Sequence, residues 1–181
     1  MTEPDNDAIQ QPEVILDIED LNRLQAQKLN QRVREALANQ TDAREASLAI
    51  FDLLDEDPRS QDEWTPPQHA FYMAALCGCL AQSSGFESAM ANNGPWMHEV
   101  MQSIARMDSE IGIFLMDELR ALLPGKCFPS DDASGAAAIE AWTPQQHQKL
   151  KELESKFADY AADQMLLDMA SFVSTTIDEW V

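Results

Sequence analysis

Residues 64–82 read WTPPQHAFYMAALCGCLAQ, and this stretch decides the fold. Thr65 is followed by two prolines and then by Gln68, a pattern that predicts a helix with Thr65 as its N-cap and Pro66 at its first position. Apolar side chains then surround the helix on nearly every side. Because a helix that is apolar all round needs neighbours all round, we expect this segment to be the central helix of the core.

The hexapeptide WTPQQH at residues 142–147 nearly repeats the start of that helix, WTPPQH at residues 64–69. Thr143 and Gln146 stand at the N-cap and third helical positions, so both sites predict a capping box. The segments that follow the two hexapeptides share nothing beyond helicity. We therefore interpret the repeat as two helices that begin by the same physics, rather than as an internal duplication.

Helical spacing of apolar residues recurs along the rest of the chain, and no segment alternates as a strand would. We predict an all-α protein of about seven to eight helices, with residues 14–181 as a single globular domain. The polar, acidic residues 1–13 are predicted to be a disordered tail. The expected helices are 17–39, 42–56, 65–82, a short one bracketed by Gly85 and Gly94, 96–107, 109–123, 144–160 and 161–180, with a loop at 125–138.

The chain carries 32 acidic and 12 basic residues, which gives a formal charge of −20. Such a field repels the phosphates of nucleic acids and of anionic lipids, so we expect no direct nucleic-acid binding and no membrane association. The same field attracts basic surfaces, and DNA-binding proteins carry the commonest large ones. No apolar run approaches the ~20 residues of a membrane span, and an odd count of three cysteines favours reduced thiols. We expect a cytoplasmic protein.

Familiar catalytic patterns are missing from the sequence. It has no nucleophile elbow, no glycine-rich phosphate loop and no helix with paired histidines for a metal. Cys77 and Cys79 lie two apart on a predicted helix, so their side chains diverge and cannot share a metal ion there. The three histidines, His69 among them, are interpreted as ordinary polar surface. We therefore expect no enzymatic activity, no cofactor and no metal site.

Residues 82–94 read QSSGFESAMANNG, in which a Gly85-Phe86 step opens a short helix that closes at Asn92 and Gly94. This arrangement resembles the signature of the bacterial DNA-mimic protein nineteen family, whose members are small, acidic and all-helical. The resemblance covers roughly residues 65–178, including the preceding apolar helix, the helix pair at 97–123, Phe128-Pro129 and the final acidic helices around 157–173. It implies a protein that binds the DNA-binding surface of a transcription regulator or another basic protein and blocks its binding to DNA.

Rows of acidic side chains would supply this mimicry. Duplex DNA carries about one charge per 1.7 Å of axis, and carboxylates three or four residues apart on a helix stand about 5 to 6 Å apart. Few basic residues accompany these rows, and between Phe157 and Val181 there are five acids and no base. The carboxylates predicted to contact the partner are Asp52, Asp55, Glu56, Asp57, Asp62, Glu63, Asp117, Glu118, Asp159, Asp163 and Asp168.

Two other interpretations stay open on the sequence alone. An immunity or antitoxin protein that neutralises a basic toxin such as a nuclease would need the same negative surface. A structural adaptor would instead bind through an apolar groove near Phe86, Met90 and Trp96, and its binding would depend weakly on salt. Trp180 is expected to be exposed near the C-terminus, as part of a packed tail or of a homodimer contact.

Overall fold

The computed structural model describes residues 17–83, 85–92 and 94–181, and the regular structure of these residues is entirely helical. The predicted all-α fold is therefore confirmed, while the predicted tail at residues 1–13 lies outside the described residues. No helix in these ranges is both long and apolar enough to cross a membrane. The elements are α1 (Ile18–Asn39), α2 (Ala43–Asp55), η1 (Gln61–Glu63), α3 (Pro66–Ser83), α4 (Phe86–Asn92), α5 (Gly94–Arg106), α6 (Glu110–Ala121), η2 (Pro124–Lys126), α7 (Asp132–Glu140), α8 (Pro144–Ala162), α9 (Gln164–Thr176) and η3 (Ile177–Glu179), where η marks a short 3₁₀ helix.

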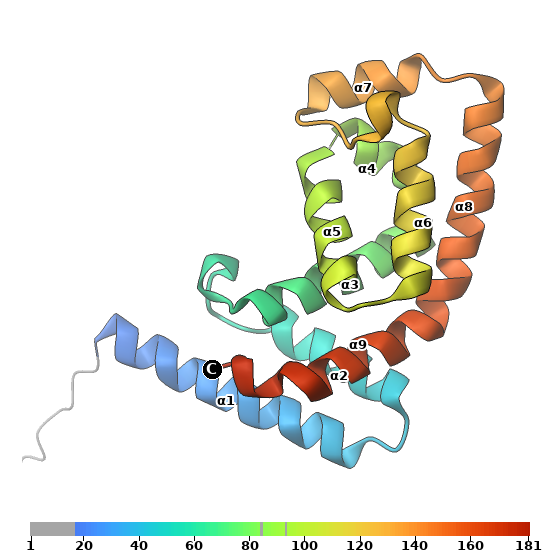
Figure 1. Cartoon of the computed structure of the whole chain (residues 1–181). Helices are drawn as coiled ribbons and strands as arrows, with labels where there is room; N and C mark the ends of the chain where they lie inside the picture. The colour runs from blue at the N-terminus through green and yellow to red at the C-terminus, as the bar shows by residue number, and fades with distance from the viewer. Residues whose placement is uncertain (1–16, 84, 93) are drawn as a thin grey trace, which may run out of the picture.

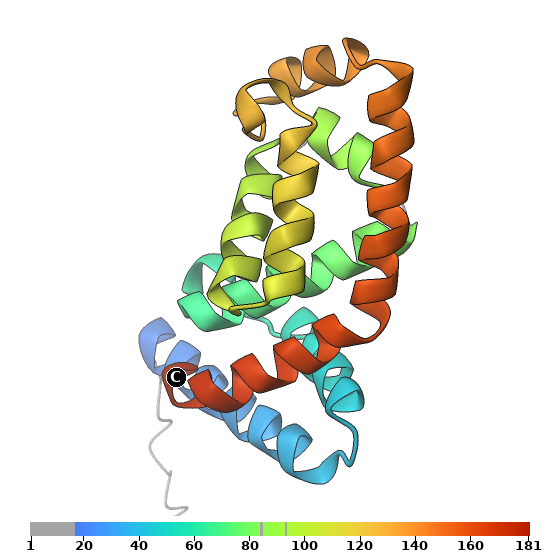
Figure 2. The ribbon, with the colours of Figure 1, turned by 45° about the vertical axis from the view of Figure 1, so that its right-hand side comes forward.

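α3 is the central helix, as the sequence predicts. Residues 70–74 are buried without a break, and α3 contacts α2, α5, α8 and α9. Figure 1 shows α3 crossing between a lower layer of α1, α2 and α9 and an upper group of α5, α6 and α8, with α4 and α7 at the far end of that group. Figure 2 shows the same arrangement from a second direction. One hydrophobic core draws side chains from all nine described α-helices.

The described part of the chain has nine α-helices instead of the predicted seven to eight, and the additional one is α7. Residues 125–138 carry no apolar stripe and are therefore predicted as a loop, yet Asp131 caps a helix there by accepting a 2.8 Å hydrogen bond from Ser134 N. α7 packs on α4 at close range, because a Cβ on Gly135 would lie only 2.4 Å from Met90 O. Small residues at a helix crossing form this helix, so hydrophobic periodicity cannot detect it.

The glycine-bracketed stretch forms the short helix α4, and α5 begins at Gly94 rather than at Trp96. Gly85 has a φ of 76°, a conformation that favours glycine. Phe86 N donates a 2.8 Å hydrogen bond to Glu154 Oε1 on α8, and the same oxygen would lie 2.7 Å from a Cβ at position 85. The start of α4 is thus capped by a side chain 68 positions away. Ser84 and Asn93 lie outside the described residues.

The two predicted capping boxes differ. At Thr143 both arms form, since Gln146 N donates to Thr143 Oγ1 at 3.3 Å and Thr143 N donates to Gln146 Oε1 at 3.0 Å. At Thr65 only the glutamine arm forms: Thr65 N donates to Gln68 Oε1 at 2.8 Å, while Thr65 Oγ1 is buried with no partner among the described residues. The two similar hexapeptides therefore both start helices, but only the one at residues 142–147 forms the complete capping box.

Trp180 is fully buried, so the predicted exposure is wrong. Its ring packs edge-to-face on Phe71 with centroids 5.9 Å apart, and Gln68 Nε2 donates a 3.0 Å hydrogen bond to Trp180 O. The indole fills the core because α3 leaves apolar surface on this side for it to cover. Trp180 thus belongs to a packed tail, and the observation that indicated a homodimer contact is removed.

Candidate partner-binding surface and adjoining cavity

Five of the eleven predicted carboxylates form ion pairs with basic side chains of the same chain. The sequence between Phe157 and Val181 has no base, yet Arg44 of α2 reaches Asp163 and Arg34 of α1 reaches Asp178. Segments distant in sequence therefore cancel part of the predicted charge rows. The five pairs are Glu56 with Arg32, Asp57 with Arg59, Asp117 with Arg120, Glu118 with Lys149 and Asp163 with Arg44.

The side chain of Asp57 is buried. Its side chain is 2% exposed and that of Arg59 is 3% exposed, and Arg59 Nη2 donates to Asp57 Oδ2 at 2.6 Å. Arg59 N also donates to Asp57 Oδ1 at 3.1 Å, so the pair fixes the turn between α2 and η1. The prediction that Asp57 contacts a partner is therefore corrected: its charge is cancelled inside the fold.

Asp168, which is half-buried, forms a cluster with the buried side chains of Ser109 and Tyr160, which we call the Ser109 cluster. Ser109 caps α6, because its Oγ accepts a 3.2 Å hydrogen bond from Gly112 N, and it donates to Asp168 Oδ2 at 2.6 Å. Tyr160 OH lies 2.7 Å from Ser109 Oγ and 3.3 Å from Asp168 Oδ2. Burial, with a smaller contribution from the Asp168 charge, raises the pKa of Tyr160. Asp168 therefore joins α6, α8 and α9 rather than facing a partner freely.

Four of the remaining carboxylates follow one another from α2 through η1, and none of them forms an ion pair with a described residue. We call these four, Asp52, Asp55, Asp62 and Glu63, the acidic rim. Two are held by neutral donors: Tyr72 OH donates to Asp55 Oδ1 at 2.9 Å, and Ser60 N donates to Glu63 Oε2 at 3.0 Å. A neutral donor positions a carboxylate without cancelling its charge. The fifth carboxylate, Asp159, is exposed on α8, apart from the rim.

Three aromatic side chains link the two halves of the acidic rim. Tyr72 of α3 stacks on Phe51 of α2 with ring centroids 5.4 Å apart, and it meets Trp64 edge-on at 4.9 Å. Phe51 immediately precedes Asp52, and Trp64 immediately follows Glu63. Burial, followed by the hydrogen bond to Asp55, raises the pKa of Tyr72. The aromatic contacts thus bring the end of α2 and η1 together on one side of α3.

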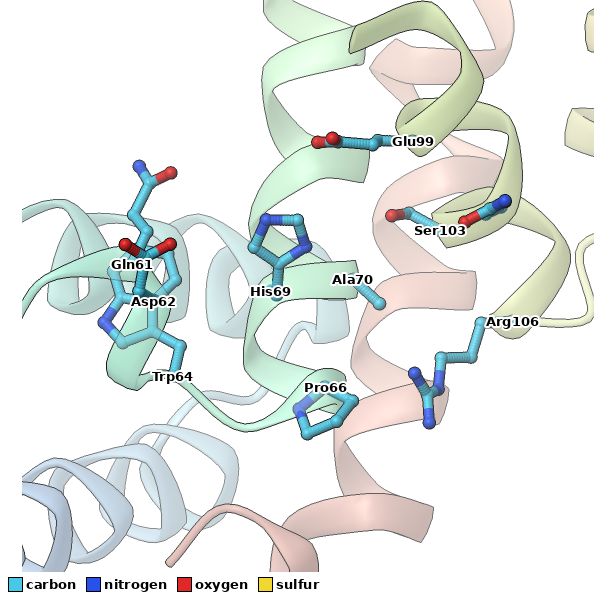
Figure 3. Close-up of a pocket in the computed structure, with 10 residues that line it drawn as sticks. Gln61, Asp62, Trp64, Pro66, His69, Ala70, Glu99, Ser103 and Arg106 are labelled. Carbon is cyan, nitrogen blue, oxygen red and sulfur yellow. The ribbon is translucent and has the colours of Figure 1, made fainter. Parts of the chain in front are cut away.

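A cavity of about 340 Å³ adjoins the rim, between η1, the start of α3 and the last turns of α5 (Figure 3). We call it the rim cavity. Asp62 lines it from η1 and His69 from α3, while Glu99, Ser103 and Arg106 line it from α5. The three α5 residues stand at i, i+4 and i+7 and so share one helix face. Figure 3 shows Glu99 and Arg106 at opposite ends of this face, with Ser103 between them.

The rim cavity contains polar groups without partners in the described part of the chain. Glu99 and Arg106 are both exposed and line the same space without pairing, although every other arginine of the described ranges pairs with a carboxylate. Ser103 is 5% exposed, and its hydroxyl forms no hydrogen bond with a described residue. These groups are absent from the predicted site, and the only sequence signal for them is the i, i+4, i+7 spacing of residues 99, 103 and 106 on one face of α5.

The apolar groove predicted near Phe86, Met90 and Trp96 does not form from these residues. Phe86 and Met90 are fully buried, and the Phe86 ring packs edge-to-face on Phe157 with centroids 4.8 Å apart. Trp96 is half-buried and lines a hollow with other side chains, among them Leu80. The first two residues serve the core, so the adaptor interpretation loses most of its proposed surface.

Neither a metal centre nor a relative identifies the site. Within residues 17–83, 85–92 and 94–181, no group of three or more His, Cys, Asp or Glu side chains is placed to hold a metal ion. No protein-family model, no curated protein and no solved structure matches the chain. The resemblance to the DNA-mimic protein nineteen family therefore stays a prediction from the sequence.

Proposed function

We propose that this chain is an acidic, non-catalytic protein of the cytoplasm that binds the basic DNA-binding surface of a transcription regulator or another DNA-binding protein. By occupying that surface it blocks binding to DNA, and the acidic rim is the contact surface. The proposal rests on one observation: Asp55 and Glu63 are held by neutral donors, so their charges are fixed in place and left uncancelled. A surface ordered before binding loses little conformational entropy when the partner docks.

The overall charge supports the same proposal. A formal charge of −20 steers a basic partner toward the protein, so association should be fast and sensitive to salt. Asp52 and Asp55 lie three residues apart on α2, where side chains stand about 5 to 6 Å apart. A row of carboxylates at this spacing imitates a row of phosphates, which is what a DNA-binding surface is built to meet.

A pull-down tests the proposal. The full chain serves as bait in the native cell lysate, with washes at low salt and then at about 0.5 M, where the Debye length falls to about 4 Å. We expect a DNA-binding protein, identified by mass spectrometry, that elutes with salt and that duplex DNA displaces. A nuclease or another toxin retained through the wash would favour the immunity function instead, and the absence of any basic partner would refute both.

A matched pair of variants locates the surface. The amides keep the acceptors for Tyr72 OH and Ser60 N, so the rim geometry is preserved while four charges are removed. The rim variant carries Asp52→Asn, Asp55→Asn, Asp62→Asn and Glu63→Gln, and the control carries Glu35→Gln, Glu140→Gln, Glu152→Gln and Glu179→Gln at exposed positions elsewhere. Both change the formal charge equally, so we expect only the rim variant to lose the partner. Equal losses would assign binding to net charge and remove the rim from the proposal.

A further inference from the structure

The rim cavity holds polar groups that the fold leaves unused. Ser103 is only 5% exposed, and its hydroxyl forms no hydrogen bond with a described residue. Figure 3 shows this hydroxyl pointing into the cavity, toward the side where His69 lies. The residue is nine-tenths buried while its hydroxyl opens into the cavity, so a ligand bound there can form the hydrogen bond that the fold does not supply. This is an observation independent of the acidic residues around the cavity.

The charges of the cavity are separated along α5. Glu99 and Arg106 are seven residues apart, which places them about 10 Å apart along the helix axis at about 1.5 Å per residue. The Glu99 carboxylate points away from Arg106, toward the side on which Asp62 and His69 lie (Figure 3). A matching ligand therefore has a cationic end for the two carboxylates and an oxygen acceptor, at a distance, for the guanidinium of Arg106.

We infer that the rim cavity receives an arginine side chain of the basic partner. Its guanidinium donates to the carboxylates of Asp62 and Glu99 and to the Ser103 hydroxyl, while a backbone carbonyl of the partner accepts from Arg106. Guanidinium suits this site better than ammonium, because its planar fork presents five donors and stacks on a ring such as His69. A volume of about 340 Å³ is at the low end of ligand pockets and accommodates one side chain. The identity of the partner rests on the proposed function.

The inference is tested with Nα-acetyl-L-arginine methylamide, which carries the side chain between two neutral backbone groups. The full chain is titrated at low salt while the ring protons of its three histidines are followed by NMR, with His69→Gln used for assignment. His69 lines the cavity whereas His98 and His147 do not, so they serve as internal controls. We expect a saturable shift of the His69 signal alone, and none with the uncharged citrulline analogue. Parallel shifts of all three histidines, or equal responses to arginine and citrulline, would overturn the inference.

Variants of the cavity sharpen the result. Glu99→Gln should weaken probe binding by about tenfold or more, because it removes a charged hydrogen-bond acceptor, and Ser103→Ala by about threefold. Glu152→Gln on the exposed face of α8 is the matched control and should change binding less than about twofold. If Glu99→Gln and Glu152→Gln weaken probe binding equally, the probe is held only by the overall negative charge of the protein, and the inference is overturned. If free L-arginine binds more tightly than the probe, and Arg106→Gln removes this binding, the natural ligand of the cavity is a free amino acid and the inference of a partner's side chain is overturned.

The same variants separate this inference from the proposed function. In the pull-down, Glu99→Gln and Ser103→Ala should each reduce capture of the basic partner. If both retain it fully while the rim variant loses it, the proposed function stands and the cavity is not used. If the probe binds as expected but no basic partner is captured, the cavity binds guanidinium and the proposed function fails.

Discussion

Two buried serines at the end of α5 and the start of α6 have opposite environments. Ser103 is 5% exposed and has no hydrogen-bond partner among the described residues, whereas Ser109 is 3% exposed and bonds Gly112 N, Asp168 and Tyr160. Two arginines differ in pairing and in burial, since Arg59 is buried against Asp57 whereas Arg106 is exposed at the cavity and unpaired among the described residues. Burial alone does not distinguish structural polar groups from those left for a ligand. What distinguishes them is whether the polar group has a hydrogen-bond or ion-pair partner within the described residues.

The largest expected difference is between Arg59 and Arg106. Arg59→Met should lower the free energy of unfolding by about 3 kcal/mol or more, because it leaves the Asp57 carboxylate buried without its cation. Arg106→Met breaks no described ion pair and should change stability by less than about 0.5 kcal/mol. Urea unfolding followed by circular dichroism measures both. Arg59→Met with Asp57→Asn should recover part of the loss, and similar values for the two single variants would break the comparison.

The two serines provide the second test. Ser109→Ala removes the cap of α6 and the donor to Asp168, so we expect a loss of about 2 kcal/mol in unfolding free energy. Ser103→Ala removes a hydroxyl that forms no hydrogen bond with a described residue. The unfolding free energy should therefore stay within about 0.5 kcal/mol of the wild-type value or rise slightly. The same denaturation experiment applies. A cost for Ser103→Ala close to that of Ser109→Ala would mean that the Ser103 hydroxyl also serves the fold.

The unfolding free energy at alkaline pH tests whether the Ser109 cluster holds Tyr160 in its protonated form. The folded state raises the pKa of Tyr160 above its unfolded value of about 10, so this contribution to stability is complete below that pH and is lost as the pH rises. We expect the wild-type protein to lose roughly 1 kcal/mol between about pH 10 and 11 on this account. Tyr160→Phe should lower stability at pH 7 but flatten the alkaline slope. An unchanged slope would show that Tyr160 ionises in the folded protein as readily as in the unfolded one.

The smallest effect is expected for an exposed ion pair that cancels charge at the surface. Arg34 Nη2 lies 2.6 Å from Asp178 Oδ1, with side chains 49% and 90% exposed. Arg34→Gln should cost about 0.5 kcal/mol or less, and the difference should shrink at about 0.5 M salt, where surface charges are screened. Thermal unfolding at two salt concentrations measures it. A larger, salt-independent cost would place this pair with the buried one at Arg59.

Most of the fold could be predicted from local pattern, because apolar spacing and helix-breaking residues are encoded nearby in the sequence. The segment predicted at 65–82 is α3, Pro66–Ser83, and the one predicted at 144–160 is α8, Pro144–Ala162. α7 escaped prediction because its Gly135 acts through contact with a distant helix. The pairing of the candidate carboxylates could not be predicted in this way, because Asp163 has no basic neighbour in the sequence and pairs with Arg44, 119 positions away.

The starts of two helices have a consequence for protein synthesis. In the first turn of α3, the side-chain amide of Gln68 donates a hydrogen bond to the carbonyl of Trp180, 112 positions away, and at the start of α4 Phe86 N donates to Glu154. At about 5 to 20 residues per second, the ribosome needs roughly 5 to 20 s to pass from residue 68 to residue 180. Throughout that interval the apolar α3 lacks the indole that covers it. The nascent chain therefore carries this apolar helix uncovered, and chaperones that hold it during translation should raise the yield of folded protein.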